Sequence, residues 1–320
     1  MSLSNGENIN SKIQLFYKDW NEIATYFYKY WQQNGRETKI LPFIKKNENH
    51  FLGNYILIRE FFKNIHPYNF LKEGNNAIQI GFHDQYIENG ISHPFIIKSV
   101  IGKLGKIWAI DPDPINIKSA ISYCTKNNVE KFYSIESGVW EEPGKKDFIF
   151  FSDYTSSNTI SPIFEERKKK REKRWGEKRI KENTSKVSVK IDTLDNIIGR
   201  NSKDDKIDLI NITTNGAETE ILNGAKETIQ NNDNIKITFP LGNISNKGLD
   251  YLSEMGFRLA ISNSPHRPWE DEQFFYACAI RESTEKLVSR GYRKVNLDSY
   301  MPQEGSNLHF IINEKKEDNG

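Results

Sequence analysis

The sequence predicts an α/β fold in which a mostly parallel sheet lies between two layers of helices. From about residue 74 to residue 282, short apolar runs alternate with amphipathic stretches, which is the pattern of strands joined by crossover helices. The chain has 320 residues, enough for one large domain or two smaller ones. Its 19 Phe, 14 Tyr and 6 Trp residues are ample for a packed core.

Seven strands can be assigned in this region, with helices between them. The predicted strands cover residues 77–81, 106–111, 131–136, 207–212, 235–239, 258–262 and 274–281. The predicted helices cover residues 94–104, 115–127, 192–198, 218–230 and 248–255. A further strand is expected in a hairpin at residues 147–152.

Two extensions flank this domain, which we place at residues 74–282. Residues 1–73 form a helical N-terminal extension, because residues 13–32 carry aromatic side chains at helical spacing and a second helix is expected at 53–63. Core packing explains this aromatic stripe better than a ligand site does. Residues 283–320 form a C-terminal extension, in which residues 287–293 echo 252–258. That echo indicates either a small duplication or coincidence.

Composition excludes several classes of function. The net charge of +2 points to no particular partner. No apolar run approaches the roughly 18 residues of a membrane span, and the N-terminus has no apolar signal region. Cys124 and Cys278 lie far apart, without the spacing of metal ligands. We therefore expect a cytoplasmic protein without a metal site.

The ends of three predicted strands carry the residues that suggest a binding site. In doubly wound sheets, ligands bind beyond the carboxyl ends of the strands. Gly81 ends the first strand and would let the backbone approach a cofactor closely. Asp111 ends the second strand, where an acid can accept hydrogen bonds from both ribose hydroxyls of a nucleoside. Asp113 is expected only to cap the next helix.

The third strand end is the polar turn that follows residues 207–212. Its side chains would lie at the mouth of the site, beside any transferred group: Asn211, Thr213, Thr214 and Asn215. Glu218 and Glu220 fall in the first turn of the next helix, where the helix dipole favours acidic side chains.

At this point the chain resembles the FkbM family of S-adenosylmethionine (SAM) dependent methyltransferases. The resemblance is carried by IDPDP (110–114), SGVWEEPGKKDF (137–148), the triplet TLD (193–195) and DLINITTNGAETEILNGAKETI (208–229). It implies a Rossmann-like class I methyltransferase sheet whose last strand runs antiparallel. It also implies SAM as the methyl donor, and O-methylation of a hydroxyl on a small-molecule or glycan-type acceptor.

Site residues follow from the same resemblance and from the strand ends. The expected cofactor-binding residues are Gln79, Gly81, Phe82, His83, Asp111, Pro112 and Ser137. The expected catalytic residues are Asn211, Thr213, Asn215, Glu218 and His83. A hydroxyl acceptor benefits from a general base, and the candidates for that base are His83, Asp84, His93, Glu218 and His266.

The sequence also departs from the family pattern. The family's Asp-x-Gly-Ala at the first strand is here Gln79-Ile-Gly81-Phe82. The family's Lys-x-Asp-x-Glu-Gly has become Asn211-Ile-Thr213-Thr-Asn215-Gly216, so three charged groups are neutral. The alternative function is therefore a weak or inactive methyltransferase-fold module that binds a partner. An enzyme using another nucleotide cofactor lacks a supporting glycine-rich phosphate loop.

One segment has an extreme composition. Residues 165–182 contain ten basic and five acidic side chains, within an insertion at 165–183 between the third and fourth strands of the sheet. Mixed signs at helical spacing favour a solvated helix with ion pairs four residues apart. A less favoured hypothesis is that this segment binds a nucleic acid or another anionic partner. The insertion is also placed to cover the acceptor site as a lid.

Overall fold

The fold is that of a computed structural model of the chain. The structure describes residues 20–34, 40–47, 50–152, 158–202, 204–241, 244–262, 276–290, 292–295 and 308–311. Among the described helices, none has the length and apolar character needed to cross a lipid bilayer. Within the same ranges, no group of three or more His, Cys, Asp or Glu side chains is arranged to hold a metal ion.

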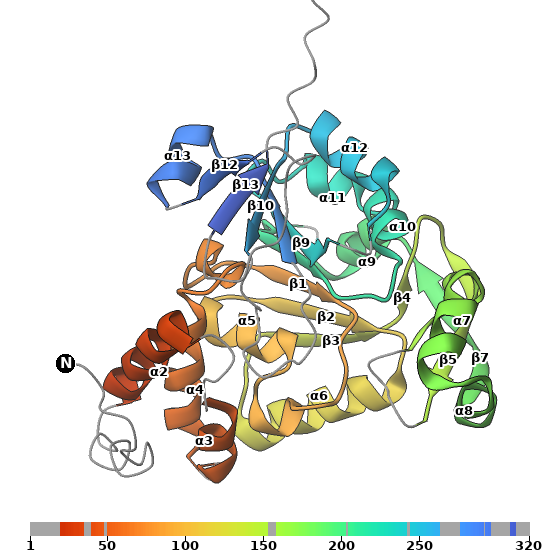
Figure 1. The fold of residues 1–320 in the computed structure, drawn as a ribbon, viewed down its shortest axis with the longest axis horizontal. Coiled ribbons are helices and arrows are strands. Elements are labelled where there is room, and N and C mark those ends of the chain that lie inside the picture. Colours follow the sequence, from red (N-terminus) through yellow and green to blue (C-terminus); the bar gives the residue numbers. More distant parts are fainter. Residues whose placement is uncertain are drawn as a thin grey trace, which may run out of the picture.

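A nine-stranded sheet forms the centre of the described structure (Figure 1). Its strands, from one edge to the other, are β12 (Arg293–Val295), β13 (Leu308–Ile311), β10 (Arg258–Ser262), β11 (Tyr276–Ile280), β9 (Lys236–Pro240), β8 (Leu209–Ile212), β1 (Ala77–Ile80), β2 (Ile107–Asp111) and β3 (Phe132–Glu136). The five strands from β9 to β3 are parallel, and β11 runs antiparallel to both β9 and β10.

Seven of these strands are the seven predicted from the sequence, and the antiparallel last strand is confirmed. The two additional strands, β12 and β13, come from the C-terminal extension. They continue the sheet beyond β10, since β13 pairs antiparallel with β10 and β12 pairs parallel with β13. The extension therefore enlarges the predicted sheet.

Helices cover both faces of the sheet, as predicted (Figure 1). One layer contains α5 (His93–Ile101) and α6 (Pro114–Asn127). The other contains α9 (Leu194–Asn201), α10 (Glu218–Asn223), α11 (Lys226–Gln230) and α12 (Asn246–Glu254). Strand residues alternate between the layers: Ile78 and Ile80 pack in the core that includes α9 and α10, whereas Ala77 packs in the core that includes α5.

The prediction of one helix over residues 218–230 is wrong in one respect, because the structure has two helices there, α10 and α11. The interruption lies at Gly224, where an added Cβ would come within 2.1 Å of the carbonyl oxygen of Trp140. That carbonyl presses on the backbone, so only glycine fits. Asp195 then accepts hydrogen bonds from the backbone N–H groups of Glu227 and Thr228, which holds the start of α11. The TLD triplet thus has a structural role.

The N-terminal extension packs against α5, in a hydrophobic cluster that also contains residues of the sheet. Its helices are α2 (Trp20–Asn34), α3 (Ile40–Lys46) and α4 (Phe51–Phe62), followed by the short 3-10 helix η2 (Tyr68–Phe70). A second 3-10 helix, η3 (Ile87–Asn89), follows β1 and belongs to the sheet domain. Within the described part of the aromatic stripe, Phe27 is buried in one cluster with residues of α5, and Tyr26 and Tyr28 pack against that cluster, as expected for core packing. Residues 13–19 of the stripe lie outside the described residues.

His66 joins this N-terminal extension to the C-terminal one. Its Nε2 donates to the carbonyl of Tyr276 (3.0 Å), so its Nδ1 accepts from the hydroxyl of Tyr292 (2.9 Å). Tyr292 precedes β12 and follows α13 (Thr284–Ser289). His66 and Tyr292 are both buried, so this hydrogen bond ties together segments more than 200 residues apart.

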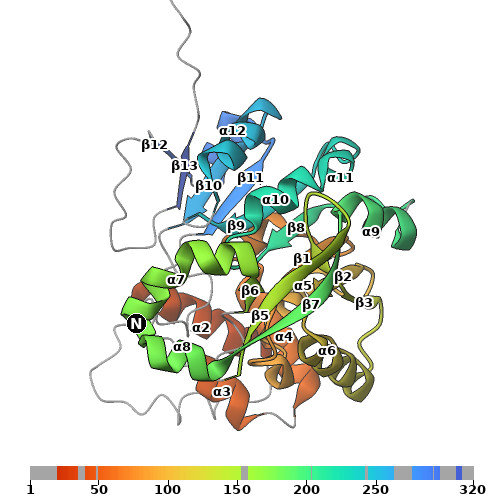
Figure 2. The ribbon, with the colours of Figure 1, turned by 90° about the vertical axis from the view of Figure 1, so that its right-hand side faces the viewer.

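A second sheet carries the basic insertion. It consists of β4 (Gly138–Val139), β7 (Thr184–Asp192), β5 (Gly144–Phe151) and β6 (Thr159–Ile160), in that order. Helices α7 (Ser161–Trp175) and α8 (Glu177–Asn183) connect β6 to β7, and α7 lies beside one end of the antiparallel pair β5–β7 (Figure 2). The expected strand at 147–152 is confirmed within β5. The sequence reading missed β7, although its residues TSKVSVKID alternate as an amphipathic strand does.

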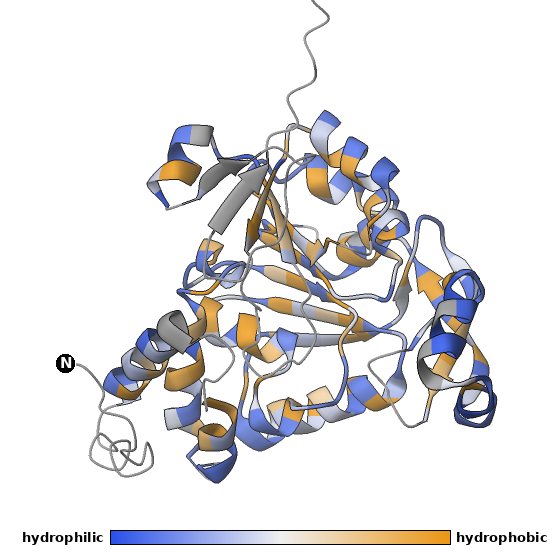
Figure 3. Ribbon diagram, viewed as in Figure 1, coloured by the Kyte–Doolittle hydropathy of each residue, from blue (hydrophilic) through white to orange (hydrophobic). Residues whose placement is uncertain are grey.

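The insertion has its own small apolar core. Four buried side chains form it: Ile149, Phe151, Phe164 and Ile180. The outer surfaces of α7 and α8 are hydrophilic, in contrast to the central sheet (Figure 3). The charged segment is helical, as predicted, but it forms two helices, α7 and α8. They separate at Gly176, where φ is +86°.

Candidate active site at the strand ends

Asp111 holds together the turns that follow β1 and β2. Its Oδ2 accepts the backbone N–H of Phe82 (2.8 Å), and its Oδ1 accepts the backbone N–H of Asp113 (2.8 Å). The carboxyl group is buried, and this burial raises its pKa to about 7, although the hydrogen bonds oppose the rise. Asp111 therefore lies where the sequence placed it, with its oxygens already engaged by the backbone.

Asn116 extends the polar surface around Asp111. Its Nδ2 donates to the carbonyl of Phe82 (2.6 Å) and to Asp111 Oδ1 (3.2 Å). Its Oδ1 is buried and has no hydrogen-bond partner among the described residues. Buried acceptors are normally satisfied, so this oxygen marks a place where a donor from a ligand can bind. The sequence reading did not single out Asn116, which only the fold of α6 brings beside Asp111.

The remaining predicted cofactor residues lie around the same turns. Phe82 is buried, and its backbone makes the contacts described above. Pro112 is half-buried in the turn between Asp111 and Asp113. Ser137 is buried after β3, donates its backbone N–H to the carbonyl of Asp111 (3.1 Å), and donates its hydroxyl to the carbonyl of Gly138. All of them therefore lie at one edge of the sheet.

Asp113 caps α6, as expected, and also connects to the insertion. Its Oδ1 accepts the backbone N–H of Ile115 (2.8 Å), and its Oδ2 accepts from Asn158 Nδ2 (2.9 Å). The carbonyl of Asn158 in turn accepts from Asn215 Nδ2 (2.9 Å). Asn158 thus bridges the end of β2 and the turn after β8, a role that no motif in the sequence indicates.

A row of neutral polar side chains crosses β1, β8 and β9. Asn211 Nδ2 donates to Gln79 Oε1 (2.5 Å), and Asn211 Oδ1 accepts from the hydroxyl of Thr238. These three residues are opposite one another in strand register, and each is at most 1% exposed. Asn211 and Gln79 are the two positions at which the family pattern has Lys and Asp, and here they form a hydrogen-bonded amide pair.

Thr213 links this row to the glycine at the end of β1. Gln79 Nε2 donates to Thr213 Oγ1 (2.8 Å) and to the carbonyl of Gly81 (2.6 Å), and the Thr213 hydroxyl donates to that same carbonyl. Gly81 has φ +72°, and an added Cβ would come within 3.0 Å of both the Thr213 carbonyl oxygen and Thr214 Cγ2. Glycine is therefore required by close packing of two strand ends.

Glu218 is fully buried at the start of α10. The Thr214 hydroxyl donates to its Oε1 (3.1 Å). The carboxylate therefore lies behind Thr214 and steadies the turn after β8, in keeping with the helix-end role that the sequence also allows.

The candidate histidine bases are placed differently. His83 is half-buried directly after β1, beside the turn held by Asp111. His93 is buried, and its Nδ1 is hydrogen-bonded to the hydroxyl of Tyr68 (3.1 Å), which gives it a structural role at the start of α5. His266 lies outside the described residues. Asp84 is half-buried in the turn after His83.

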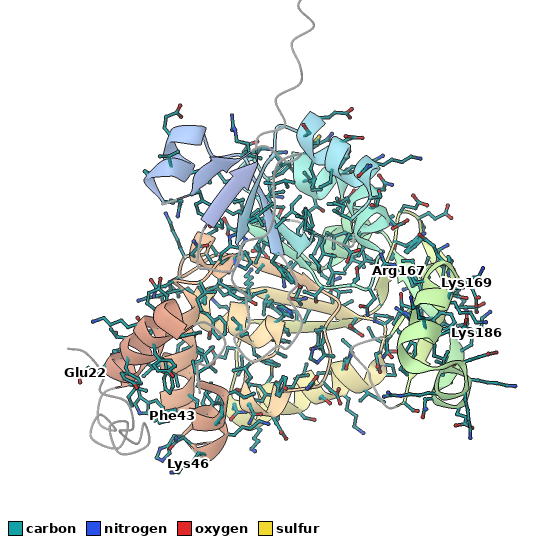
Figure 4. The ribbon with its side chains drawn as sticks, viewed as in Figure 1. Glu22, Phe43, Lys46, Arg167, Lys169 and Lys186 are labelled. Carbon is teal, nitrogen blue, oxygen red and sulfur yellow. The ribbon has the colours of Figure 1, made fainter. Side chains whose placement is uncertain are left out.

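The insertion brings Arg167 to this edge of the sheet. Arg167 Nη1 donates to the carbonyl of Asn215 (3.3 Å), and a Cβ at Gly216 would lie 2.7 Å from Arg167 Nη2. Figure 4 shows Arg167 on the side of α7 that faces the main sheet, with Lys169 on the opposite side. Arg171 lies one turn further along, with its guanidinium over the rings of Phe151 and Phe164. The sequence reading assigned neither arginine to the site.

Comparison with known proteins agrees with this architecture. Residues 79–259, more than half of the chain, match the family model described as the methyltransferase FkbM domain. A search of curated proteins found no match.

Solved methyltransferase structures are similar at low sequence identity. The methyltransferase FkbM from Methylobacillus flagellatus is 12% identical with a TM-score of 0.41, and the match covers 78% of this chain and 60% of that one. A SAM-dependent O-methyltransferase from Thermotoga maritima is 11% identical with a TM-score of 0.36, covering 70% and 71%. Aeropyrum pernix fibrillarin, solved with bound SAM, is 9% identical with a TM-score of 0.34, covering 65% and 67%.

The seven central strands have the order of a doubly wound sheet, and polar residues gather at their carboxyl ends. Together with the family match over residues 79–259, this shows that the chain belongs to the FkbM methyltransferase family and has a Rossmann-like fold.

Proposed function

We propose that this protein is a SAM-dependent O-methyltransferase that acts on an oxygen of a small-molecule or glycan-type acceptor. The observation that carries the proposal is the cluster of Asp111, Asn116 and the Phe82 backbone at the carboxyl ends of β1 and β2. Ligands of doubly wound sheets bind at this edge, and the family match supports methyl transfer there.

The residues at this edge fit a nucleoside group. Asp111 Oδ2 accepts one backbone N–H, which leaves a lone pair that can accept from a ribose hydroxyl. Asn116 Oδ1 is a buried acceptor without a partner among the described residues, and it lies on the side chain that contacts Asp111. When bound, SAM supplies an activated methyl group on a sulfonium. The chain's own part is to hold the adenosine with Asp111 and Asn116 and to keep the first turn fixed through the Phe82 N–H.

The turn after β8 would position the acceptor. Methyl transfer is an in-line displacement, so much of the catalysis is orientation of the two reacting groups. Asn215 and Thr214 are half-buried there and offer an amide and a hydroxyl for orientation. A hydroxyl is the acceptor that the family resemblance implies, and His83 is the half-buried candidate for its base.

Calorimetric titration with SAM and S-adenosylhomocysteine (SAH) tests the cofactor. Asn116→Ala should weaken binding of both, whereas Asn127→Ala, at the other end of α6, should not. Transfer from labelled SAM then tests activity. Binding without any transfer would favour the alternative function, an inactive binding module, and absence of SAM and SAH binding would overturn the proposal.

A further inference from the structure

Asn158 uses its side chain and its backbone to tie three segments together. Its Nδ2 donates to Asp113 Oδ2 (2.9 Å) in the turn after β2, and its Oδ1 accepts the backbone N–H of Phe151 (2.8 Å) at the end of β5. Its backbone carbonyl accepts from Asn215 Nδ2 (2.9 Å) in the turn after β8. These contacts fix the orientation of the side-chain amide, because only its NH2 group can donate to a carboxylate and only its oxygen can accept an N–H.

The bridge made by Asn158 spans the end of β1, because β1 lies between β8 and β2 in the sheet. Under the proposed function, the turn after β2 belongs to the cofactor and the turn after β8 to the acceptor. A link between the two turns therefore bears on the alignment of the methyl donor with the acceptor. In-line transfer is sensitive to that alignment, since much of the catalysis is orientation of the reacting groups.

The first residues of the insertion give this bridge a buried support. Ile160 pairs with Phe148 in antiparallel register, and Ile160 and Ile163 are buried in the same hydrophobic core as Phe148. The insertion also packs closely on the turn after β8, because a Cβ added at Gly216 would come within 3.0 Å of Ile163 Cγ2. Asn158 thus joins a part of the insertion that is fixed against the acceptor turn to the turn after β2.

Asp113 is in turn connected to the proposed nucleoside site. Its backbone N–H donates to Asp111 Oδ1 (2.8 Å), while Asp111 Oδ2 has the lone pair for a ribose hydroxyl. A series of hydrogen bonds therefore continues from Asp111 and Asp113 through the bridge to Asn215. Neighbouring hydrogen bonds in such a series strengthen one another, and a ligand that orders one end reduces the motion of the other.

We infer that Asn158 is a positioning residue, which transmits the order that a bound nucleoside imposes on the turn after β2 to the acceptor turn after β8. This inference rests on the proposed function. It gives the insertion a role in the reaction, because the cofactor then prepares the acceptor turn. SAM accordingly binds before the acceptor.

A reciprocal exchange of the two side chains tests the link in the full chain. Asn158→Asp sets one carboxylate against another, and Asp113→Asn sets two NH2 groups against each other, because the remaining oxygen is needed to cap α6. In the double variant the amide and the carboxylate have changed places, so the hydrogen bond can form again with its direction reversed. All three variants keep an oxygen for the α6 cap and an acceptor for the Phe151 N–H.

Hydrogen exchange of the peptide at residues 209–221 reports on the acceptor turn, with SAH and adenosine as the two ligands. Adenosine lacks the homocysteine part of SAH, so its effect on this turn has to come from the nucleoside site. Each ligand should slow exchange of the turn in the wild type by about 10-fold, the scale of one hydrogen bond to a charged group. The single variants should lose most of this response, and the double variant should recover it.

Two controls separate positioning from a general loss of stability. Exchange in α9 should be the same in all variants, whereas global destabilisation would speed it as well. Asp147→Asn, which changes a carboxylate elsewhere in the insertion, should respond as wild type does.

Single variants that respond as wild type does, or a double variant that responds no better than the single ones, would overturn the inference. So would a wild-type turn that does not respond while ligand binds. If adenosine does not bind, the responses to SAH decide between these outcomes. Failure of SAM and SAH to bind would instead refute the proposed function.

Discussion

Gln79 and Asn211 face each other on neighbouring parallel strands, and the Asn211 amide donates to the Gln79 carbonyl oxygen at 2.5 Å. The family pattern has an acid and a lysine at these two positions. The two departures seen in the sequence therefore contact each other, as an amide pair with matched donor and acceptor. The neutral side chains of Gln79, Asn211 and Thr238 are hydrogen-bonded to one another without any charged group.

Restoring one charge alone should consequently damage the protein. Asn211→Lys would bury an unpaired ammonium group between Gln79 and Thr238, which should lower the free energy of unfolding by about 3–5 kcal/mol. Adding Gln79→Asp should recover much of that loss by supplying the partner charge. Urea denaturation of the wild type, both single variants and the double variant measures this coupling. If the changes in unfolding free energy of the two single variants simply add in the double variant, residues 79 and 211 do not interact energetically.

Asp111 should make stability depend on pH. Its folded pKa of about 7 lies above its ordinary value of 3.8, chiefly because of burial. Its contribution to stability is therefore complete below about pH 4 and is lost as the pH rises through 7. We expect Asp111→Asn to remove this loss, as measured by urea denaturation from pH 4 to pH 8. The surface variant Asp147→Asn should keep the wild-type profile.

Binding of SAM should change in the opposite direction with pH. The carboxylate form of Asp111 accepts from ribose hydroxyls better than the protonated form does, so affinity should increase as the pH rises through about 7. Asp111→Ala should weaken binding by about 1–3 kcal/mol. Calorimetry at pH 6, 7 and 8 measures both effects, and an affinity that is the same in wild type and Asp111→Ala would remove this residue from the cofactor site.

His66 should oppose Asp111 in the stability profile. Burial lowers the pKa of His66 to about 4, below its ordinary value of 6.5. Its contribution is therefore present above pH 6.5 and is lost as the pH falls towards 4. His66→Gln should make the protein less sensitive to acid in that range. Tyr292→Phe should cost about 1–3 kcal/mol, because it leaves the buried His66 Nδ1 without its donor. Equal unfolding free energies for Tyr292→Phe and wild type would contradict this.

The outer lysines of α7 should be dispensable. Changing Lys168, Lys169 and Lys173 to glutamine should alter neither SAM affinity nor methyl transfer, because these side chains are exposed to solvent. Fluorescence anisotropy with labelled single-stranded RNA at low salt provides a direct check. Binding that falls steeply with salt and disappears in the triple variant would restore the nucleic-acid hypothesis.

Some elements of the fold could be predicted from the sequence, and others could not. The strands ending at Gly81 and Asp111 were predicted because apolar runs and turn residues lie next to each other in the chain. Asp113 was correctly expected to cap α6 for the same reason. The need for glycine at the break in this helix, Gly224, could not be predicted, because it comes from contact with the carbonyl of Trp140, which lies more than 80 residues away in the chain.

The sequence by itself determined the fold class, the seven central strands along the chain and the family, because periodicity, caps and motifs are written in neighbouring residues. Only the tertiary structure decided how the site is assembled. The amide pair of Gln79 and Asn211, the bridge through Asn158 and the approach of Arg167 to Gly216 join residues separated by about 50 to more than 130 positions. Such contacts depend on strand register and on packing of the insertion against the sheet, which arise from burial of the whole core rather than from any local pattern.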